Sequence, residues 1–287
     1  DYSNDSATAA TKGPLSAIKY AGGATGNTSY GYNAGGYPGA TNTKIDRIDY
    51  SNDTATALAK GNLVKGGRTP AAASPRANAI PLTSTITKTV DKGADGYGNP
   101  VGTDYGYYGG GSAPGAPTPG PYSTIDRIDF NNDTVTASPR GKLLISNSEM
   151  ASVSSPSHSY WLGTNRSDFL RLDLSDDSTN TLSKGNIPYV ARSAAGTGTP
   201  SVGYIAGAYP NRSNVSKIDF SNDTATAPSI VNLPLALGGV GGAGNQSFGY
   251  ITGGYTSDKT SYVHRIDYAN DTGTISPKGP LAVTQYF

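Results

Sequence analysis

The sequence predicts an all-β fold built from repeated units. A nine-residue motif occurs six times, and its copies begin at Asp1, Asp49, Asp129, Asp173, Asp219 and Asp267. Four of the five intervals between these starts are 44 to 48 residues long, whereas the second is 80 residues long. Glycine occurs 38 times and only 15% of the residues are charged, a composition typical of short strands and tight turns. A repeat of about 40–50 residues has the size of a propeller blade, so we expect one β-propeller domain spanning residues 1–287.

Each unit is expected to contain four strands. The first is a run of small residues, such as 15–21, and the second carries tyrosines and ends in paired glycines, as in 30–36. Glycine suits this place because it lets the backbone bend where side chains would obstruct it. The third is an Ile-Asp strand that leads into a Ser-Asn-Asp turn, as in 45–53. The fourth follows the turn and contains Thr54 and Thr56.

The count of these elements predicts six blades. Five complete units cover residues 13–278, and a split sixth blade would combine residues 281–287 with the N-terminal hairpin. A ring closed in this way removes the edge strands that invite aggregation. The split blade lacks a tyrosine strand, so the alternative is a seven-bladed ring of which this chain is a piece.

The order of the elements resembles the blade of kelch and galactose-oxidase-like β-propellers, in which an apolar strand leads to a double glycine, a Tyr-Asp-Pro-like turn and a closing strand. The resemblance covers most of the chain. It departs where the tryptophan typical after the kelch turn is replaced by Ala55, Val135 and Ala225, while Trp161 lies on a tyrosine strand. The low charge, the absence of cysteine and the Gly/Ser/Thr/Asn-rich repeats are also similar to virion propeller proteins of marine cyanobacterial phages.

The surplus of the second interval forms an insertion at residues 64–104, within the second unit. Long insertions in a scaffold of short turns are commonly either binding loops or flexible excursions, and both alternatives stay open. The alternation at residues 83–90 predicts one ordered strand within it, which favours a contact with a partner.

Tyrosines outside the periodic strand are the best candidates for contacts, because their rings can stack on sugars. Arginines of the insertion add charge to the same set. The candidate ligand or partner contacts are Arg68, Arg76, Tyr97, Tyr37, Tyr122, Tyr209 and Tyr255.

No catalytic, cofactor or metal site is expected. Glu149 is the only glutamate, so a Glu/Glu glycosidase pair is impossible, and the copper site of galactose oxidase needs a cysteine that this chain lacks. The Asp-Asn-Asp turns offer oxygen ligands without the full spacing of a calcium loop, and such residues also favour turns by bonding their own backbone. Basic residues of the Ile-Asp strand, such as Arg47 and Arg127, are expected to form ion pairs between neighbouring blades.

The expected function is that of a non-enzymatic binding or structural propeller on a phage particle or tail fibre, contacting host surface glycans or other virion proteins. A net charge of +1 removes the electrostatic case for nucleic acid, and no apolar run approaches the ~20 residues of a membrane helix. The alternatives are a bacterial extracellular or cell-surface structural or adhesion protein, and an enzyme with a site in the central channel. Both leading alternatives imply an extracellular or virion-surface location, and assembly into a homo-oligomer stays open.

Overall fold

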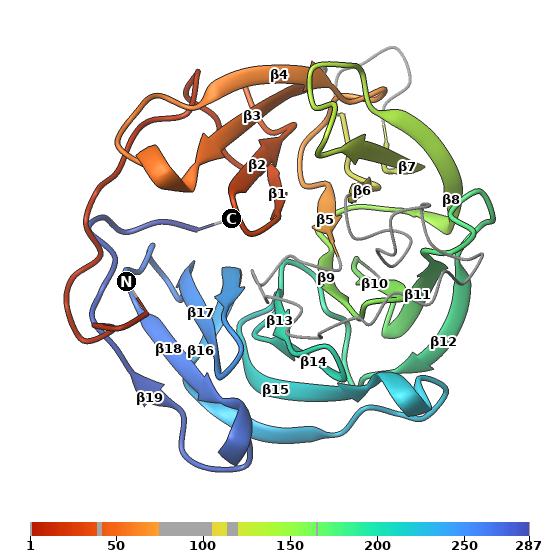
Figure 1. Cartoon of the computed structure of the whole chain (residues 1–287). Coiled ribbons are helices and arrows are strands. Elements are labelled where there is room, and N and C mark those ends of the chain that lie inside the picture. The colour runs from red at the N-terminus through yellow and green to blue at the C-terminus, as the bar shows by residue number, and fades with distance from the viewer. Residues whose placement is uncertain (1, 39–41, 75–104, 114–119, 165, 287) are drawn as a thin grey trace, which may run out of the picture.

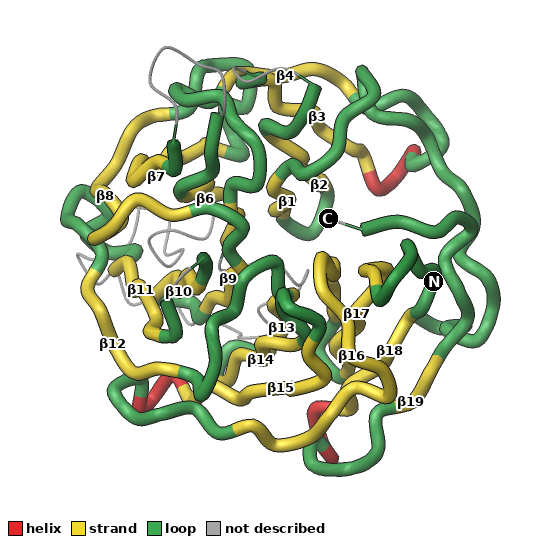
Figure 2. The backbone as a smooth tube through the Cα atoms, turned by 180° about the vertical axis from the view of Figure 1, so that it is seen from behind, coloured by secondary structure: helices red, strands yellow, loops and turns green. Residues whose placement is uncertain are grey.

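The computed structural model describes residues 2–38, 42–74, 105–113, 120–164 and 166–286. These residues form antiparallel sheets that stand side by side around a common centre, a propeller-like arrangement (Figure 1). Within them, the only helices are the short 3₁₀ turns η1 (Tyr50–Asn52), η2 (Phe220–Asn222) and η3 (Tyr268–Asn270), at the periphery of the ring (Figure 2). The predicted all-β fold is therefore confirmed.

Five groups of four strands follow one another along the chain. The first sheet contains β1 (Gly23–Gly26), β2 (Tyr30–Ala34), β3 (Lys44–Asp49) and β4 (Leu58–Asn62). The second contains β5 (Ala71–Ala73), β6 (Tyr105–Gly109), β7 (Tyr122–Asp129) and β8 (Ser138–Asn147). The third contains β9 (Ala151–Ser154), β10 (His158–Leu162), β11 (Asp168–Asp173) and β12 (Leu182–Asn186).

The fourth and fifth sheets share one long strand, β16 (Ser229–Gly244), whose first part pairs with β15 and whose second part pairs with β17. The fourth sheet also contains β13 (Ala195–Gly198), β14 (Val202–Ala206) and β15 (Arg212–Asp219). The fifth also contains β17 (Phe248–Tyr255), β18 (Val263–Asp267) and β19 (Ser276–Pro277).

The first strand of each sheet lies nearest the centre, where β1 contacts β5, β5 contacts β9, and β9 contacts β13 (Figure 1). The centre is crowded at particular positions, because a Cβ on Gly196 of β13 would lie 2.0 Å from the carbonyl oxygen of Ser152. The prediction that residues 15–21 form the first strand is wrong, because these residues are not in a strand. They form a link that ends at Ala21, with a φ of 58°, and β1 begins at Gly23.

The tyrosine strand and its glycine bend form as predicted. The central tyrosines of four of these strands are almost fully buried: Tyr32, Tyr107, Tyr160 and Tyr204. After β2 the chain turns through Gly35 and Gly36, whose φ angles of 70° and 96° lie in the left-handed region that favours glycine. The sharp exit from the crowded interior is thus made by residues without a Cβ.

The Asx turn after the third strand also forms as predicted, but the fourth strand begins later. The Oδ1 atom of Asp49 accepts a hydrogen bond from the backbone N–H of Ser51 at 2.9 Å. The predicted threonine strand is wrong, because Thr54 belongs to the turn and β4 begins only at Leu58.

Apolar clusters join each sheet to its neighbours. In one of them, Trp161 of the third sheet packs with Ala71, Tyr107 and Leu143 of the second sheet. Three further clusters join the first and second, third and fourth, and fourth and fifth sheets. Stability therefore arises mainly between neighbouring units, as in other repeat architectures.

The segments before the first sheet and after the fifth lie together between these two sheets (Figure 1). The backbone N–H of Ala9 donates to the carbonyl of Pro280 at 2.9 Å. Residues 2–22 and 278–286 form isolated bridges but no strand, so the expected split sheet does not form from these described residues. Of the predicted insertion, residues 75–104, with the strand expected at 83–90, lie outside the described residues.

Candidate functional site

A polar cluster recurs where two sheets meet, and we call it a joint. In the first joint, Tyr32 on β2 stands directly opposite Arg47 on β3. The Tyr32 hydroxyl and the Arg47 Nη1 atom each donate a hydrogen bond to Oδ2 of Asp133, both at 2.9 Å. Asp133 is the second aspartate of the next sheet's Asx turn, and the ring of Phe130 from that turn stacks on Tyr32 with 4.9 Å between centroids. This joint thus combines a ring stack with a charge-assisted hydrogen bond.

The joint occurs five times among the described residues. Its acceptors are Asp133, Asp177, Asp223, Asp271 and Asp5, and their side chains are 7 to 14% exposed. The tyrosine and basic donors stand opposite each other in register as Tyr32/Arg47, Tyr107/Arg127, Tyr160/Arg171, Tyr204/Lys217 and Tyr250/Arg265. The predicted ion pairs between neighbouring units are confirmed, and most of their surface is shielded from water.

Protonation in the joints is set by these contacts. Burial and the carboxylate of Asp5 raise the pKa of Tyr250 to about 12, so its hydroxyl keeps its proton. Burial alone would raise the pKa of Asp5, but hydrogen bonds from Tyr250, Lys278 and Arg265 lower it on balance. The carboxylate is therefore a fixed acceptor, which suits a structural contact better than proton transfer.

The candidate binding site lies at the other end of the sheets. Because Tyr30 pairs with Asp49, the Asx turn is at one end of the sheet. Gly23 pairs with Ala34 and Lys44 pairs with Asn62, so the links that enter the first strands and the loops between second and third strands emerge at the opposite end. We refer to this end as the loop face.

Aromatic rings and cations gather on the loop face around the fourth and fifth sheets. The ring of Tyr255 lies 6.3 Å from that of Tyr209 and 5.9 Å from that of Tyr286, measured between centroids. The guanidinium of Arg192 lies 4.8 Å from the centre of the Tyr209 ring, and Lys259 Nζ lies 5.2 Å from that of Tyr286. Tyr209 and Tyr286 are nearly half exposed, so these rings are available to a ligand.

A second group of the same kind lies on the loop face of the first sheet. The rings of Tyr20 and Tyr37 are 5.1 Å apart, and the guanidinium of Arg68 lies 5.5 Å from the centre of the Tyr37 ring. Both tyrosines are exposed. We call the two groups together the aromatic rim; its members are Tyr20, Tyr37, Arg68, Arg192, Tyr209, Tyr255, Lys259 and Tyr286.

Glu149 interacts electrostatically with an arginine of each group of the rim, Arg192 and Arg68. Arg192 donates to both of its carboxylate oxygens, at 2.6 and 3.0 Å, and the Ser193 hydroxyl donates at 2.9 Å. Burial opposes ionisation, but these hydrogen bonds and the charges of Arg192 and Arg68 lower the pKa of Glu149 on balance. The only glutamate of the chain thus holds Arg192 in place beneath the Tyr209 ring.

The structure brings four of the seven predicted contact residues into the rim. These are Tyr37, Arg68, Tyr209 and Tyr255. Tyr122, half-buried, begins β7 at the same end, opposite Asn147. Arg76 and Tyr97 lie outside the described residues.

Sequence reasoning missed Tyr20, Arg192, Lys259 and Tyr286. A signal for two of them was present, because Gly-Pro-Leu occurs at Gly13 and at Gly279, and a tyrosine follows seven residues after each glycine. Both tyrosines then contact the tyrosine that follows a glycine bend, Tyr37 in one case and Tyr255 in the other. Arg192 and Lys259 have no such repeated context.

Other features of the described residues do not compete with the rim as a site. A depression of about 200 Å³ lies at the Asx-turn end, between Phe169 of the third sheet and Lys217, Asn222 and Pro228 of the fourth. No group of three or more histidine, aspartate or glutamate side chains in the described ranges is placed to hold a metal ion. A helix with the length and apolar character to cross a membrane is likewise missing from these ranges.

No family model and no curated protein matches this chain. A solved structure described as "Structure of YjhT" is similar to it, with a TM-score of 0.70 and 10% sequence identity. The match covers 96% of this chain and 88% of that chain. At this level of identity the likeness concerns the fold alone, and it agrees with a sheet-rich, propeller-like architecture over nearly the whole length.

Proposed function

We propose that this protein is a non-enzymatic binding module whose aromatic rim contacts surface glycans. The observation that carries the proposal is the gathering of exposed tyrosine rings with Arg68, Arg192 and Lys259 on one face. Tyrosine offers a flat apolar surface on which the C–H face of a sugar can stack, together with a hydroxyl for hydrogen bonding. Binding sites made of such rigid rings lose little conformational entropy on binding.

The charge of the rim favours acidic glycans. The rim contains the three cations Arg68, Arg192 and Lys259, of which Arg192 is paired with the carboxylate of Glu149. Arg68 and Lys259 lie over tyrosine rings, where a carboxylate or sulfate on a stacked sugar would meet them. We therefore place glycans with acidic groups ahead of neutral ones.

The wider setting of the proposal is a phage particle or tail fibre, with the ring exposed on its surface. Support comes from the Gly/Ser/Thr/Asn-rich sequence of the repeats, the low fraction of charged residues and the lack of cysteine. We also propose six sectors, five of them four-stranded sheets and the sixth holding the residues around Asp5 and Pro280. Asp5 accepts Tyr250 and Arg265 as the equivalent aspartates accept their own donors, which supports this count.

A glycan array with neutral and acidic members tests the proposal. The intact chain should bind acidic glycans, and the double variant Tyr209→Ala, Tyr255→Ala should lose that binding. Tyr262→Ala is a matched control, because Tyr262 is about as exposed as Tyr209 but makes no ring contact with the rim. Equal binding by the double variant and the intact chain, or no binding to any glycan, would rule the rim out as a glycan site.

The non-enzymatic part of the proposal has its own test. Incubation of the intact chain with a panel of acidic and neutral polysaccharides should release no reducing sugar. Release that depends on Glu149, whose pKa is lowered beside the rim, would show an enzyme instead.

A further inference from the structure

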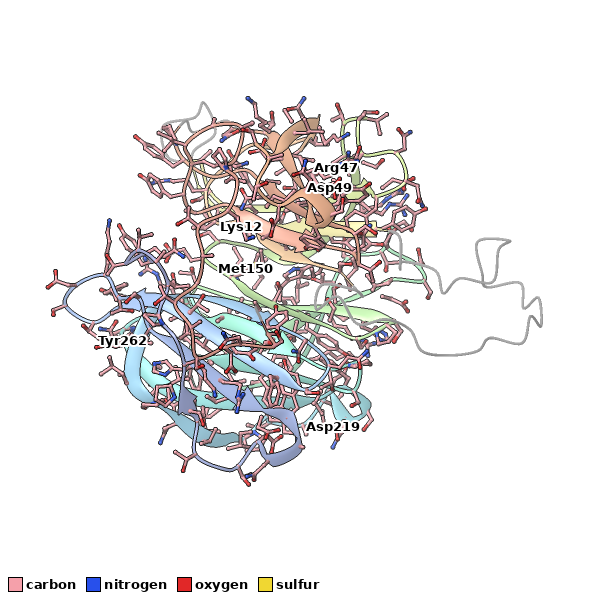
Figure 3. All side chains as sticks on the ribbon, turned by 60° about the vertical axis from the view of Figure 1, so that its left-hand side comes forward. Lys12, Arg47, Asp49, Met150, Asp219 and Tyr262 are labelled. Atoms are coloured by element: carbon pink, nitrogen blue, oxygen red, sulfur yellow. The ribbon has the colours of Figure 1, made fainter. Side chains whose placement is uncertain are left out.

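One copy of the joint is only half filled. The Asx turn of the first sheet presents Tyr50 and Asp53, which correspond to Phe130 and Asp133 of the second sheet. Asp53 receives Lys12 Nζ at 3.2 Å and its carbonyl accepts the backbone N–H of Gly13 at 2.7 Å. Among the described residues, however, it receives no tyrosine and no arginine. Figure 3 shows Lys12 on the N-terminal segment beside the sheet that carries Arg47 and Asp49.

The exposure of these two side chains shows what is missing. The Asp53 side chain is 42% exposed, whereas the five equivalent aspartates are at most 14% exposed. Tyr50 is 49% exposed, whereas Phe130 is 7% exposed beneath the ring of Tyr32. The outer end of the Tyr50 ring lies close to Gly26 and Gly31 of its own sheet, as the outer end of the Phe130 ring lies close to Gly106, so Tyr50 is placed as Phe130 is.

The five filled joints define the chemistry that fits this surface. In each of them a tyrosine stacks on, or packs beside, the first apolar residue of the turn and donates its hydroxyl to the aspartate. An arginine or lysine directly opposite that tyrosine on the neighbouring strand reaches the same oxygen. A ligand for the sixth surface therefore needs a tyrosine and a cation held across an antiparallel strand pair.

We propose that Tyr50 and Asp53 form a docking site for a partner polypeptide that presents such a Tyr/Arg strand pair. The Asp53 carboxylate would accept the tyrosine hydroxyl and the guanidinium, while Tyr50 would stack on the incoming ring. A second copy of this chain is a poor occupant, because its five Tyr/basic pairs are already engaged in its own joints. The site is at the Asx-turn end of the sheets, away from the aromatic rim.

A peptide taken from the chain itself is the sharpest probe. A synthetic peptide with the sequence of residues 238–267 contains the second part of β16, β17 and β18, and so carries Tyr250 opposite Arg265. It is titrated into the full chain by isothermal calorimetry. We expect saturable binding with one peptide per chain, and at least about tenfold weaker binding after Asp53→Asn or after Tyr250→Phe in the peptide.

Control variants distinguish binding at Tyr50 and Asp53 from non-specific binding of the peptide. Changing Arg265→Ala in the peptide should weaken binding by a similar factor, whereas Tyr262→Ala in the chain should leave it unchanged. No binding, or equal binding of the intact and Tyr250→Phe peptides, would overturn the proposal. Self-association of the chain that is abolished by Tyr50→Ala would overturn it in favour of a second copy.

The test is independent of the proposed glycan function. The double variant Tyr209→Ala, Tyr255→Ala should bind the peptide normally, and Asp53→Asn should bind glycans normally. Failure of one proposal therefore leaves the other standing.

Discussion

The hydroxyl of Tyr250 donates a hydrogen bond of 2.9 Å to Asp5, although 245 positions separate the two residues in the sequence. Arg265 donates to the same carboxylate oxygen at 2.8 Å, and Lys278 Nζ lies 3.2 Å from the other oxygen. This joint ties the segment that precedes the first sheet to the fifth sheet. It should therefore stabilise the whole arrangement and not one sheet alone.

Tyr250→Phe should lower the free energy of unfolding by about 1.5–3 kcal/mol, because the change removes a hydrogen bond to a charged group and leaves the carboxylate less well paired. Urea denaturation followed by circular dichroism measures this change. Tyr50→Phe is the matched control, since its hydroxyl makes no hydrogen bond within the described part of the chain, and it should alter the free energy by less than about 0.5 kcal/mol. Equal effects of the two substitutions would contradict the role assigned to the joint.

Gly141→Ala should destabilise the protein by about 1–3 kcal/mol. A Cβ at this position would lie 1.6 Å from the carbonyl oxygen of Thr179, and the backbone N–H of Gly141 already donates to the backbone carbonyl of Asp177. Gly109→Ala is a suitable comparison, because its nearest neighbour would be Trp161 at an ordinary 3.5 Å. Thermal unfolding of both variants should show a clearly lower midpoint for Gly141→Ala only.

Acid should weaken the joints in a defined direction. The pKa values of Asp5 and Asp271 are lowered on balance, because hydrogen bonds from their tyrosine and basic partners outweigh burial. Their contribution to stability is complete above the unfolded value of about 3.9 and is lost as the pH falls through the lowered folded pKa. Urea midpoints should therefore decrease below about pH 4, and less steeply in Asp5→Asn. An identical slope in that variant would argue against the assignment.

His264 should make stability depend on pH in a higher range. It is 3% exposed, neither ring nitrogen has a hydrogen-bond partner among the described residues, and burial lowers its pKa. The unfolded chain then binds the proton more tightly, so stability is greatest above about pH 6.5 and falls as the pH decreases below that value. His264→Leu should reduce this dependence between about pH 7 and 5.

The control for that experiment is His158→Gln. Burial also lowers the pKa of His158, but its Nδ1 atom lies 2.9 Å from the Ser157 hydroxyl at an exposed position. NMR titration of both histidines measures their folded pKa values directly. A normal value of about 6.5 for His264 would contradict the prediction.

Much of the fold could be predicted from the sequence, because it depends on short-range interactions. The tyrosine strands, the glycine bends and the Asx turns depend on residues within a few positions of each other, as with Asp49 and Ser51, so their sequence patterns predicted them. The first strands were missed because they are selected by crowding at the centre. A glycine such as Gly196 is required by the approach of Ser152 from a neighbouring sheet, and nothing in its own segment indicates that approach.

The candidate site was likewise predictable from the sequence only in part. The sequence by itself determined the repeat, the all-β architecture, the ion pairs between units and Tyr37, Tyr209 and Tyr255 as candidate contacts. Only the tertiary structure decided that Tyr286 joins Tyr209 and Tyr255, that Glu149 holds Arg192, and that Asp53 alone lacks the partners of its five equivalents. The physical reason is that a joint or a rim is made between units, where contacts depend on how sheets pack around the centre and not on the order of residues within one repeat.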